Sequence, residues 1–239
     1  GATNATTDEW FFDDIRLDNL AVARLQIVHN AADPAADSVD VYVNGALFLD
    51  NFAFRTATSF VSVDADVDLN VGVAGKNSTG VADTLKNFVV NLPSGSTVVA
   101  VANGVLDPSQ FAANPDGRST AFTLFTQLAG QETAAGGGVD FYGLHGASDA
   151  PTVDIAARNV ATLLDDEAYG DVSGYQNVPA GVYTLDVLDA SGSTTLFSFT
   201  ADLTGLDSSA AGILASGFVD PSVNQGGAGA GQISGTPSA

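Results

Sequence analysis

The sequence predicts an all-β protein made of two tandem immunoglobulin-like β-sandwich domains with few short helices. Apolar and polar residues alternate with a period of two along several segments, which is typical of strands with one buried face. Gly, Pro, Asn and Asp separate these segments at intervals of roughly 8 to 12 residues, as in β-sandwiches. The pattern also occurs twice along the 239 residues, of which 45% are hydrophobic. Each half can therefore build a core of its own.

The first copy contains the clearest strands. Residues 39–43 alternate Val with Asp or Tyr and lead into Asn44-Gly45, the pair typical of a two-residue hairpin turn. A second strand should follow at residues 46–49. Along residues 61–73 every odd position is Val, Ala or Leu and every even one is Ser, Asp, Asn or Gly, so we expect one long strand with a buried and a hydrated face.

The second copy repeats this order with small changes. Residues 182–187 carry a strand, and residues 190–193 supply the turn after it. Arg158-Asn159 stands where the first copy has Asn-Gly, so we expect a longer hairpin there. The best helical segments are short, at residues 162–169 and 108–113.

The duplication divides the chain into four parts. Residues 22–132 are the first β-sandwich repeat and residues 133–225 the second, with an N-terminal segment at 1–21 and a Gly/Ser-rich tail at 226–239. The only two histidines occupy the same place in each copy. Each is followed four residues later by Asp, then by Pro and then by Val-Asp; the six residues are His29, Asp33, Asp40, His145, Asp149 and Asp154.

This motif resembles the family called domain of unknown function 4397, which occurs as tandem secreted or surface domains in bacteria and archaea. Residues 25–45 and 141–155 carry the motif, and the resemblance spans about residues 22–222. It implies a sandwich fold and an extracellular or cell-surface location. It implies no activity and no catalytic residue.

The charge of the chain excludes several kinds of partner. It has 28 acidic and 7 basic residues, for a formal net charge of -21. Such a surface repels phosphate backbones and anionic lipids, so we expect no nucleic-acid partner. No apolar run is long enough to span a membrane, so we expect no membrane insertion. Cysteine is absent, which excludes disulfides and thiolate chemistry.

The repeated His and Asp residues could serve acid–base catalysis or hold a metal, but a structural role is the stronger interpretation. Asp before Pro closes loops by accepting backbone hydrogen bonds. A duplicated active site with no nucleophile and no second histidine would be unusual. The chain also lacks the Gly-x-Ser-x-Gly, Gly-x-Gly-x-x-Gly and His-Glu-x-x-His motifs, so we expect no enzymatic activity.

Acidic residues suggest calcium at two kinds of place. Asp64, Asp66 and Asp68 lie on one face of a predicted strand, but neighbours on one face are about 6.6 to 6.8 Å apart, too far to surround one ion. Loop acids are better candidates, namely Asp13, Asp14, Asp165 and Asp166. We nevertheless expect no metal and no cofactor. Asn4 and Asn77 begin glycosylation sequons.

The N-terminal segment carries Trp10, Phe11, Phe12, Ile15 and Leu17 outside the duplicated part, and Trp10 is the only Trp. These residues could form a strand of their own first domain. Alternatively, they could form a subunit interface by pairing with a sheet edge of the next molecule.

Two functions follow from these alternatives. The leading hypothesis is a structural subunit of an extracellular filament, pilus-like fibre or surface layer, a homopolymer assembled by strand addition through the N-terminal segment. The alternative is a glycan- or protein-binding module of a cell-surface adhesin, with loops or aromatic side chains such as Tyr42, Tyr169 and Tyr175 as ligand contacts.

Overall fold

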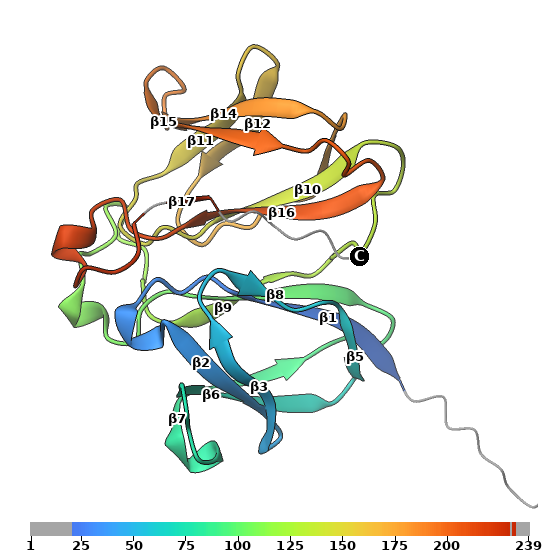
Figure 1. Ribbon diagram of the computed structural model, residues 1–239, viewed down its shortest axis with the longest axis vertical. Helices are drawn as coiled ribbons and strands as arrows, with labels where there is room; N and C mark the ends of the chain where they lie inside the picture. Colours follow the sequence, from blue (N-terminus) through green and yellow to red (C-terminus); the bar gives the residue numbers. More distant parts are fainter. Residues whose placement is uncertain (1–20, 230, 233–239) are drawn as a thin grey trace, which may run out of the picture.

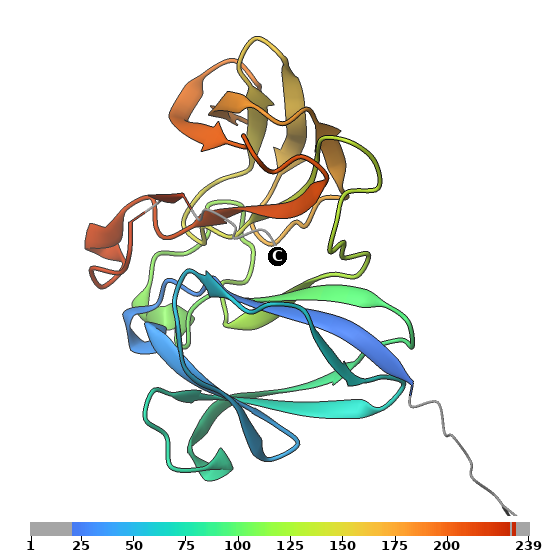
Figure 2. The ribbon, with the colours of Figure 1, turned by 45° about the vertical axis from the view of Figure 1, so that its right-hand side comes forward.

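The computed structural model describes residues 21–229, 231 and 232, and in them four β-sheets stack into four layers (Figure 1). Strands of the first repeat form one outer and one inner sheet, and strands of the second repeat form another such pair. Figures 1 and 2 both show the two inner sheets stacked between the outer ones. The predicted all-β sandwich class is confirmed. The only helices in the described residues are single 3-10 turns.

In the first repeat the inner sheet has the order β4-β1-β8-β9, with β5 also paired to β1. The outer sheet has the order β3-β2-β6-β7. Most neighbours are antiparallel, but β1 and β8 are parallel. The strands are β1 (Val22–His29), β2 (Ser38–Val43), β3 (Ala46–Ala53), β4 (Thr56–Ala57), β5 (Val61–Asp64), β6 (Asp68–Gly75), β7 (Thr84–Asn91), β8 (Thr97–Asn103) and β9 (Thr123–Gln127).

The second repeat has the same plan. Its inner sheet has the order β13-β10-β16-β17 and its outer sheet the order β12-β11-β14-β15. Here β10 and β16 are the parallel pair. The strands are β10 (Val139–His145), β11 (Val153–Ala157), β12 (Ala161–Glu167), β13 (Gln176–Val178), β14 (Val182–Asp189), β15 (Thr195–Asp202), β16 (Ser209–Ser216) and β17 (Gly231–Gln232).

Local sequence explains the turns between the strands. Asn44 and Gly45 have φ values of 50° and 84°, the left-handed geometry that a two-residue hairpin requires. In the second repeat Ala157 pairs with Ala161, which leaves three residues in the loop, so the expected longer hairpin is confirmed. Three of the four 3-10 turns begin with Asp-Pro, and each Asp side chain accepts a hydrogen bond from the amide two residues later.

Two sequence predictions are wrong. Residues 61–73 form two strands, because the chain passes from the inner sheet to the outer one at residues 65–67, where Asp66 has a φ of 57°. Residues 162–169 lie mostly in strand β12 and not in a helix. The adjacent Leu163 and Leu164 fit the apolar pattern of a helix as well as that of a strand. Pairing with β11 makes the segment a strand. In the segment 108–113 only Pro108–Gln110 is helical.

The two repeats pack through their inner sheets. One cluster of buried side chains joins residues from both, with Val28, Val99 and Val101 on the first repeat and Tyr142 and Leu144 on the second. Because these inner strands bury both faces, β10 is buried along its whole length. Part of the predicted C-terminal tail also belongs to this layer, since β17 pairs with β16.

Candidate binding cleft

The two histidines are buried inside loops of their own repeats. His29 Nε2 lies 2.8 Å from the carbonyl oxygen of Ala36, and His145 Nε2 lies 3.0 Å from that of Pro151. Burial lowers the pKa of both imidazoles, although these hydrogen bonds act in the opposite direction. Both rings are therefore neutral at pH 7, with Nε2–H donating to the carbonyl. They hold the loop that follows β1 or β10.

The repeated aspartates hold backbone amides. Asp33 accepts hydrogen bonds from the amides of Ala35 and Leu106, at 2.8 Å each. Asp149 accepts them from the amides of Val219 and Asp220, at 2.8 and 2.9 Å. Each carboxylate thus ties the loop after the first strand, β1 or β10, to the loop after its parallel neighbour, β8 or β16.

The second aspartate of each motif acts on the outer sheet. Asp40 accepts from the amides of Asn51 and Ser78, at 2.7 Å each. These bonds, with one from the Ser78 hydroxyl, lower the pKa of Asp40 despite burial, which acts in the opposite direction. Asp154 accepts from the amide of Asp166 at 2.7 Å. All six motif residues thus bond to backbone groups.

The other predicted site residues lie apart from one another. Asp165 and Asp166 are exposed on β12, and the described residues contain no group of three or more His, Cys, Asp or Glu that could hold a metal. Asn77 is exposed in the turn after β6. Several predicted residues lie outside the described residues, namely Asn4, Trp10, Phe11, Phe12, Asp13, Asp14, Ile15 and Leu17.

The tyrosines considered for stacking on a sugar are inside the protein. Tyr42 and Tyr169 are buried, and Tyr175 packs against the cluster between the repeats. Burial raises the pKa of Tyr169 to about 12, although the hydrogen bond from Asn103 acts in the opposite direction. None of the three rings offers a free face to a ligand.

A polar network fixes the repeats to one another. Asn103, buried at the end of β8, donates to the carbonyl oxygen of Gly146 at 3.0 Å and to the Tyr169 hydroxyl at 3.1 Å. Its Oδ1 accepts from Asn30 Nδ2 at 2.9 Å. A Cβ on Gly146 would overlap Asn30 Nδ2, so only glycine fits there. The two repeats form one body.

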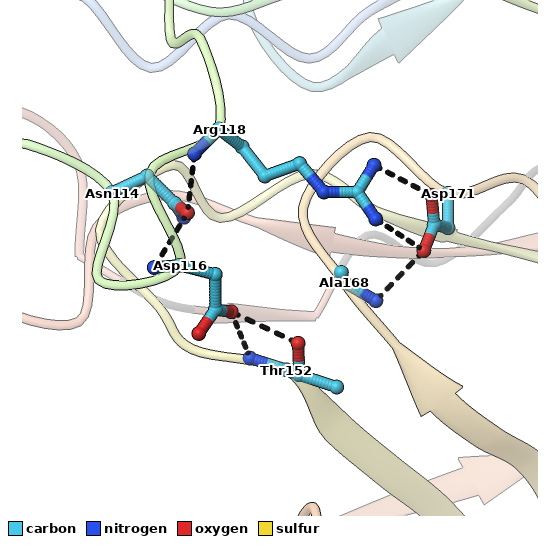
Figure 3. A network of polar contacts seen from close by, with 6 residues as sticks. All are labelled: Asn114, Asp116, Arg118, Thr152, Ala168 and Asp171. Atoms are coloured by element: carbon cyan, nitrogen blue, oxygen red, sulfur yellow. Dashed lines mark hydrogen bonds and ion pairs between the residues drawn. The ribbon is translucent and has the colours of Figure 1, made fainter.

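Figure 3 shows a second part of this network, at the loop that follows β8. Arg118 forms a two-bond ion pair with Asp171, at 3.0 and 3.2 Å. Asp116 accepts from the amide and the hydroxyl of Thr152, at 2.7 and 2.9 Å. Exposed ion pairs add little stability, so the buried asparagines and the apolar cluster contribute most to this interface.

The first repeat is open between its two sheets. An apolar cleft of about 70 Å³ lies there, lined by apolar residues and His29, and no polar atom is exposed on its wall. Strands β1, β2, β3 and β5–β9 line it. Leu25, Ile27 and Val71 on the wall are only half-buried, and Phe48 on the edge strand β3 is 38% exposed. Solvent therefore reaches the interior beside β3.

The cleft divides the interior of the first repeat. One buried cluster surrounds Val41, Val73 and Phe122, and a second surrounds Leu69 and Val98. The interior of the second repeat is a single cluster instead. The strand order is the same in both repeats, except that β4 is replaced by a single bridge, Leu144 to Val172, in the second. The difference therefore arises mainly from the side chains that fill the space.

Three equivalent positions carry a larger residue in the second repeat. Leu25 corresponds to Phe141, which is 1% exposed, and the strand registers match Val71 with Leu185 and Ala100 with Ile213. The residue paired with each is smaller in the second repeat, because Ala211, Ala157 and Gly143 stand where the first repeat has Val98, Val43 and Ile27. The large side chains are therefore placed on different strands in the two repeats. In addition, Leu164 of β12 packs over Gly143, where a Cβ would overlap its Cδ1.

The cleft was not predicted from the sequence. In the sequence, the residues of its wall look like ordinary core residues. Alternating Val and Leu residues indicate that a side chain is buried, but they do not indicate whether the two sheets are in full contact. A signal exists in the duplication itself. Comparing the core positions of the two copies shows smaller residues at positions 25, 71 and 100 than at 141, 185 and 213.

A family model described as domain of unknown function (DUF4397) matches residues 23–122 and 141–222. No curated protein matches the chain. One solved structure that it resembles is CBMbc, family CBM26, from Eubacterium rectale Amy13K, in complex with maltoheptaose. The TM-score is 0.25 and the identity 9%, over 83% of this chain and 94% of the other.

A second solved structure that the chain resembles is described as alpha-glucan binding by a streptococcal virulence factor. The TM-score is 0.23 and the identity 11%, over 80% of this chain and 92% of the other. No helix of the described residues is long and apolar enough to cross a membrane.

Proposed function

Because the chain belongs to the family called domain of unknown function 4397 and carries its domain twice, we propose that it is a binding module. It works outside the cell or on the cell surface and performs no catalysis. Its ligand is an extended apolar segment of a protein, which enters the cleft of the first repeat. The two repeats act as one rigid body that holds the sheets around this cleft at a fixed spacing.

The apolar wall of the cleft is the observation that carries this proposal. Sites for sugars and other polar ligands place hydrogen-bonding groups among apolar ones, but this wall exposes no polar atom to the cleft, and its one polar residue, His29, is bonded to the carbonyl oxygen of Ala36. A cavity of ~150 Å³ holds one benzene molecule, so about 70 Å³ suits individual side chains. Side chains that project from an extended backbone fit such a space.

The edge strand β3 can hold the backbone of that segment. Within the described residues β3 pairs only with β2, which leaves the peptide groups of its other edge available. Strand addition uses such an edge for affinity and uses pockets for alternate side chains for specificity. Phe48 and Phe52 place this edge next to the cleft.

Binding of a small apolar probe tests access to the cleft. Xenon is small enough for about 70 Å³, so we expect the native protein to bind it saturably, as followed by xenon NMR, and we expect Ala100→Ile, which introduces the side chain found at residue 213, to reduce the affinity about 10-fold or more. Ala113→Ile places the same side chain on the exposed surface and should bind as the wild type does. Val71→Leu is a second filling variant, should Ala100→Ile not fold.

The class of ligand requires a separate measurement. Arrays of short peptides and of glycans should identify extended apolar peptides as ligands that compete with xenon, and the filled variants should lose them. Equal xenon binding by wild type and filled variants would contradict the proposal. A glycan ligand whose affinity does not change when the cleft is filled would also contradict it, and would favour a sugar site elsewhere on the surface.

A further inference from the structure

We propose, resting on the function proposed above, that the ligand is the N-terminal segment of a second copy of this chain. Residues 10–17 of one copy occupy the cleft in the first repeat of another, as a strand added along β3. The chain would then be its own partner.

The segment has the residues that the cleft requires. Ile15 and Leu17 alternate with Asp14, Arg16 and Asp18, so an extended backbone directs the apolar side chains to one side and the charged ones to the other. Trp10 and two phenylalanines precede them. The cleft offers an apolar interior and an exposed mouth at Phe48, which matches both sides of such a strand.

The position of β1 favours a segment from another copy. Strand β1 pairs with β5 and β4 on one side and with β8 on the other. Both edges of β1 are therefore occupied, and the residues that precede it cannot form a hairpin with it. Its own N-terminal segment would have to reach β3 in the outer sheet and also reverse direction to lie along the cleft.

The link between residue 17 and β1 is too short both to reach β3 and to reverse the direction of the chain. Residues 18–21 span at most about 13 to 14 Å when fully extended. Packed sheets are about 10 Å apart, so the crossing alone consumes most of that length and leaves no residue for a turn. A second copy has no such limit, because its segment can enter from outside with its backbone already parallel to β3.

Charge makes this association dependent on salt. Each copy has a formal net charge of -21, so two copies repel each other unless ions screen them. The screening length falls from about 10 Å at 0.1 M to about 3 Å at 1 M salt. Apolar contacts persist at high salt, so association should strengthen as salt increases.

The single tryptophan, Trp10, permits a direct test on the full chain. We expect its emission to shift to shorter wavelength as protein concentration rises in 1 M NaCl, together with an increase in mass by sedimentation velocity. The double variant Ile15→Asp/Leu17→Asp should stay monomeric, with an apparent affinity at least about 100-fold weaker. The control Thr6→Asp/Thr7→Asp adds the same charge at polar positions and should associate as the wild type does.

A peptide of residues 8–19 distinguishes this inference from the function on which it rests. It should bind the double variant, and Ala100→Ile in the same background should weaken that binding. A blue shift that is independent of concentration would show docking within one chain and overturn the inference. If the peptide does not bind while xenon still does, the inference fails but the cleft remains a site for another ligand. If neither binds, both proposals fail.

Discussion

The interiors of the two repeats differ although their strands follow the same order apart from β4. The second repeat is closed around Phe141, Leu185 and Leu164, whereas the first is divided by a cleft beside Ala100 and Val71. The loops that define the fold are the same in both, since each uses one His and two Asp residues for backbone hydrogen bonds. Topology is thus maintained by the loops and turns, and the interior can change in volume independently.

The largest difference should appear when large side chains are truncated. Phe141→Ala opens a cavity in the closed core and should cost about 3 to 5 kcal/mol. Leu25→Ala at the equivalent position should cost at most about 2 kcal/mol, because Leu25 is half-exposed and its removal only widens an existing cleft. Urea unfolding of both variants measures this difference. Equal costs would mean that the cleft is closed in solution.

Filling the cleft should give a smaller effect of the opposite sign. Ala100→Ile should stabilise the fold by about 0.5 to 2 kcal/mol, as cavity filling commonly does. The reverse change, Ile213→Ala in the second repeat, should destabilise it by about 2 kcal/mol. A rise in the urea midpoint with an unchanged slope would identify the first effect as one on stability. A loss of stability in Ala100→Ile would indicate that the sheets cannot accept the added volume.

The smallest effect should be the pH dependence that the two repeats share. Burial lowers the pKa of His29 and His145 in the folded state. Below about pH 6.5 the unfolded chain therefore binds protons that the folded chain does not, and stability decreases as the pH falls from that value toward the folded pKa. Well above pH 6.5 both histidines are neutral in the folded and the unfolded chain, so they add no pH dependence to the free energy of unfolding.

Urea unfolding between pH 7.5 and 5.5 measures this slope, and comparison with a variant that lacks both histidines separates it from the titration of Glu167. Burial, and secondarily the charge of Asp171, raise the pKa of Glu167 from its usual 4.5. The variant His29→Gln/His145→Gln should show a flatter dependence than the wild type. An equal slope in both proteins would mean that other groups cause it.

Much of the fold could be predicted from the sequence because its signals are local. The period of two, the Asn44-Gly45 turn and the duplicated His and Asp residues indicate strands, hairpins and two copies. The break at residues 65–67 could not be predicted, since Val67 continues the apolar pattern although it is exposed in the structure. The helix expected at residues 162–169 failed because an apolar Leu pair fits either period, and pairing with β11 decided between them.

The binding cleft depends on a different kind of information. Whether two sheets meet or leave a space is determined by the summed volume of side chains from strands far apart in the sequence. Ala100 and Val71 are unremarkable alone, and they matter because they share one space with Leu25 and Ile27. Predicting such a space requires the register of all eight strands that line it.

The parallel pairing of β1 with β8, and of β10 with β16, determines how each repeat responds to a pulling force. The two strands lie side by side and point the same way, so tension between the start of one and the end of the other acts along their length. It must shear a whole row of hydrogen bonds at once, whereas an antiparallel hairpin pulled at its open end separates one bond at a time. Load applied between the start of β10 and the end of β16 acts on the second repeat in this shearing direction, whereas the first repeat ends with β9, which returns to the end of the sheet where β1 starts.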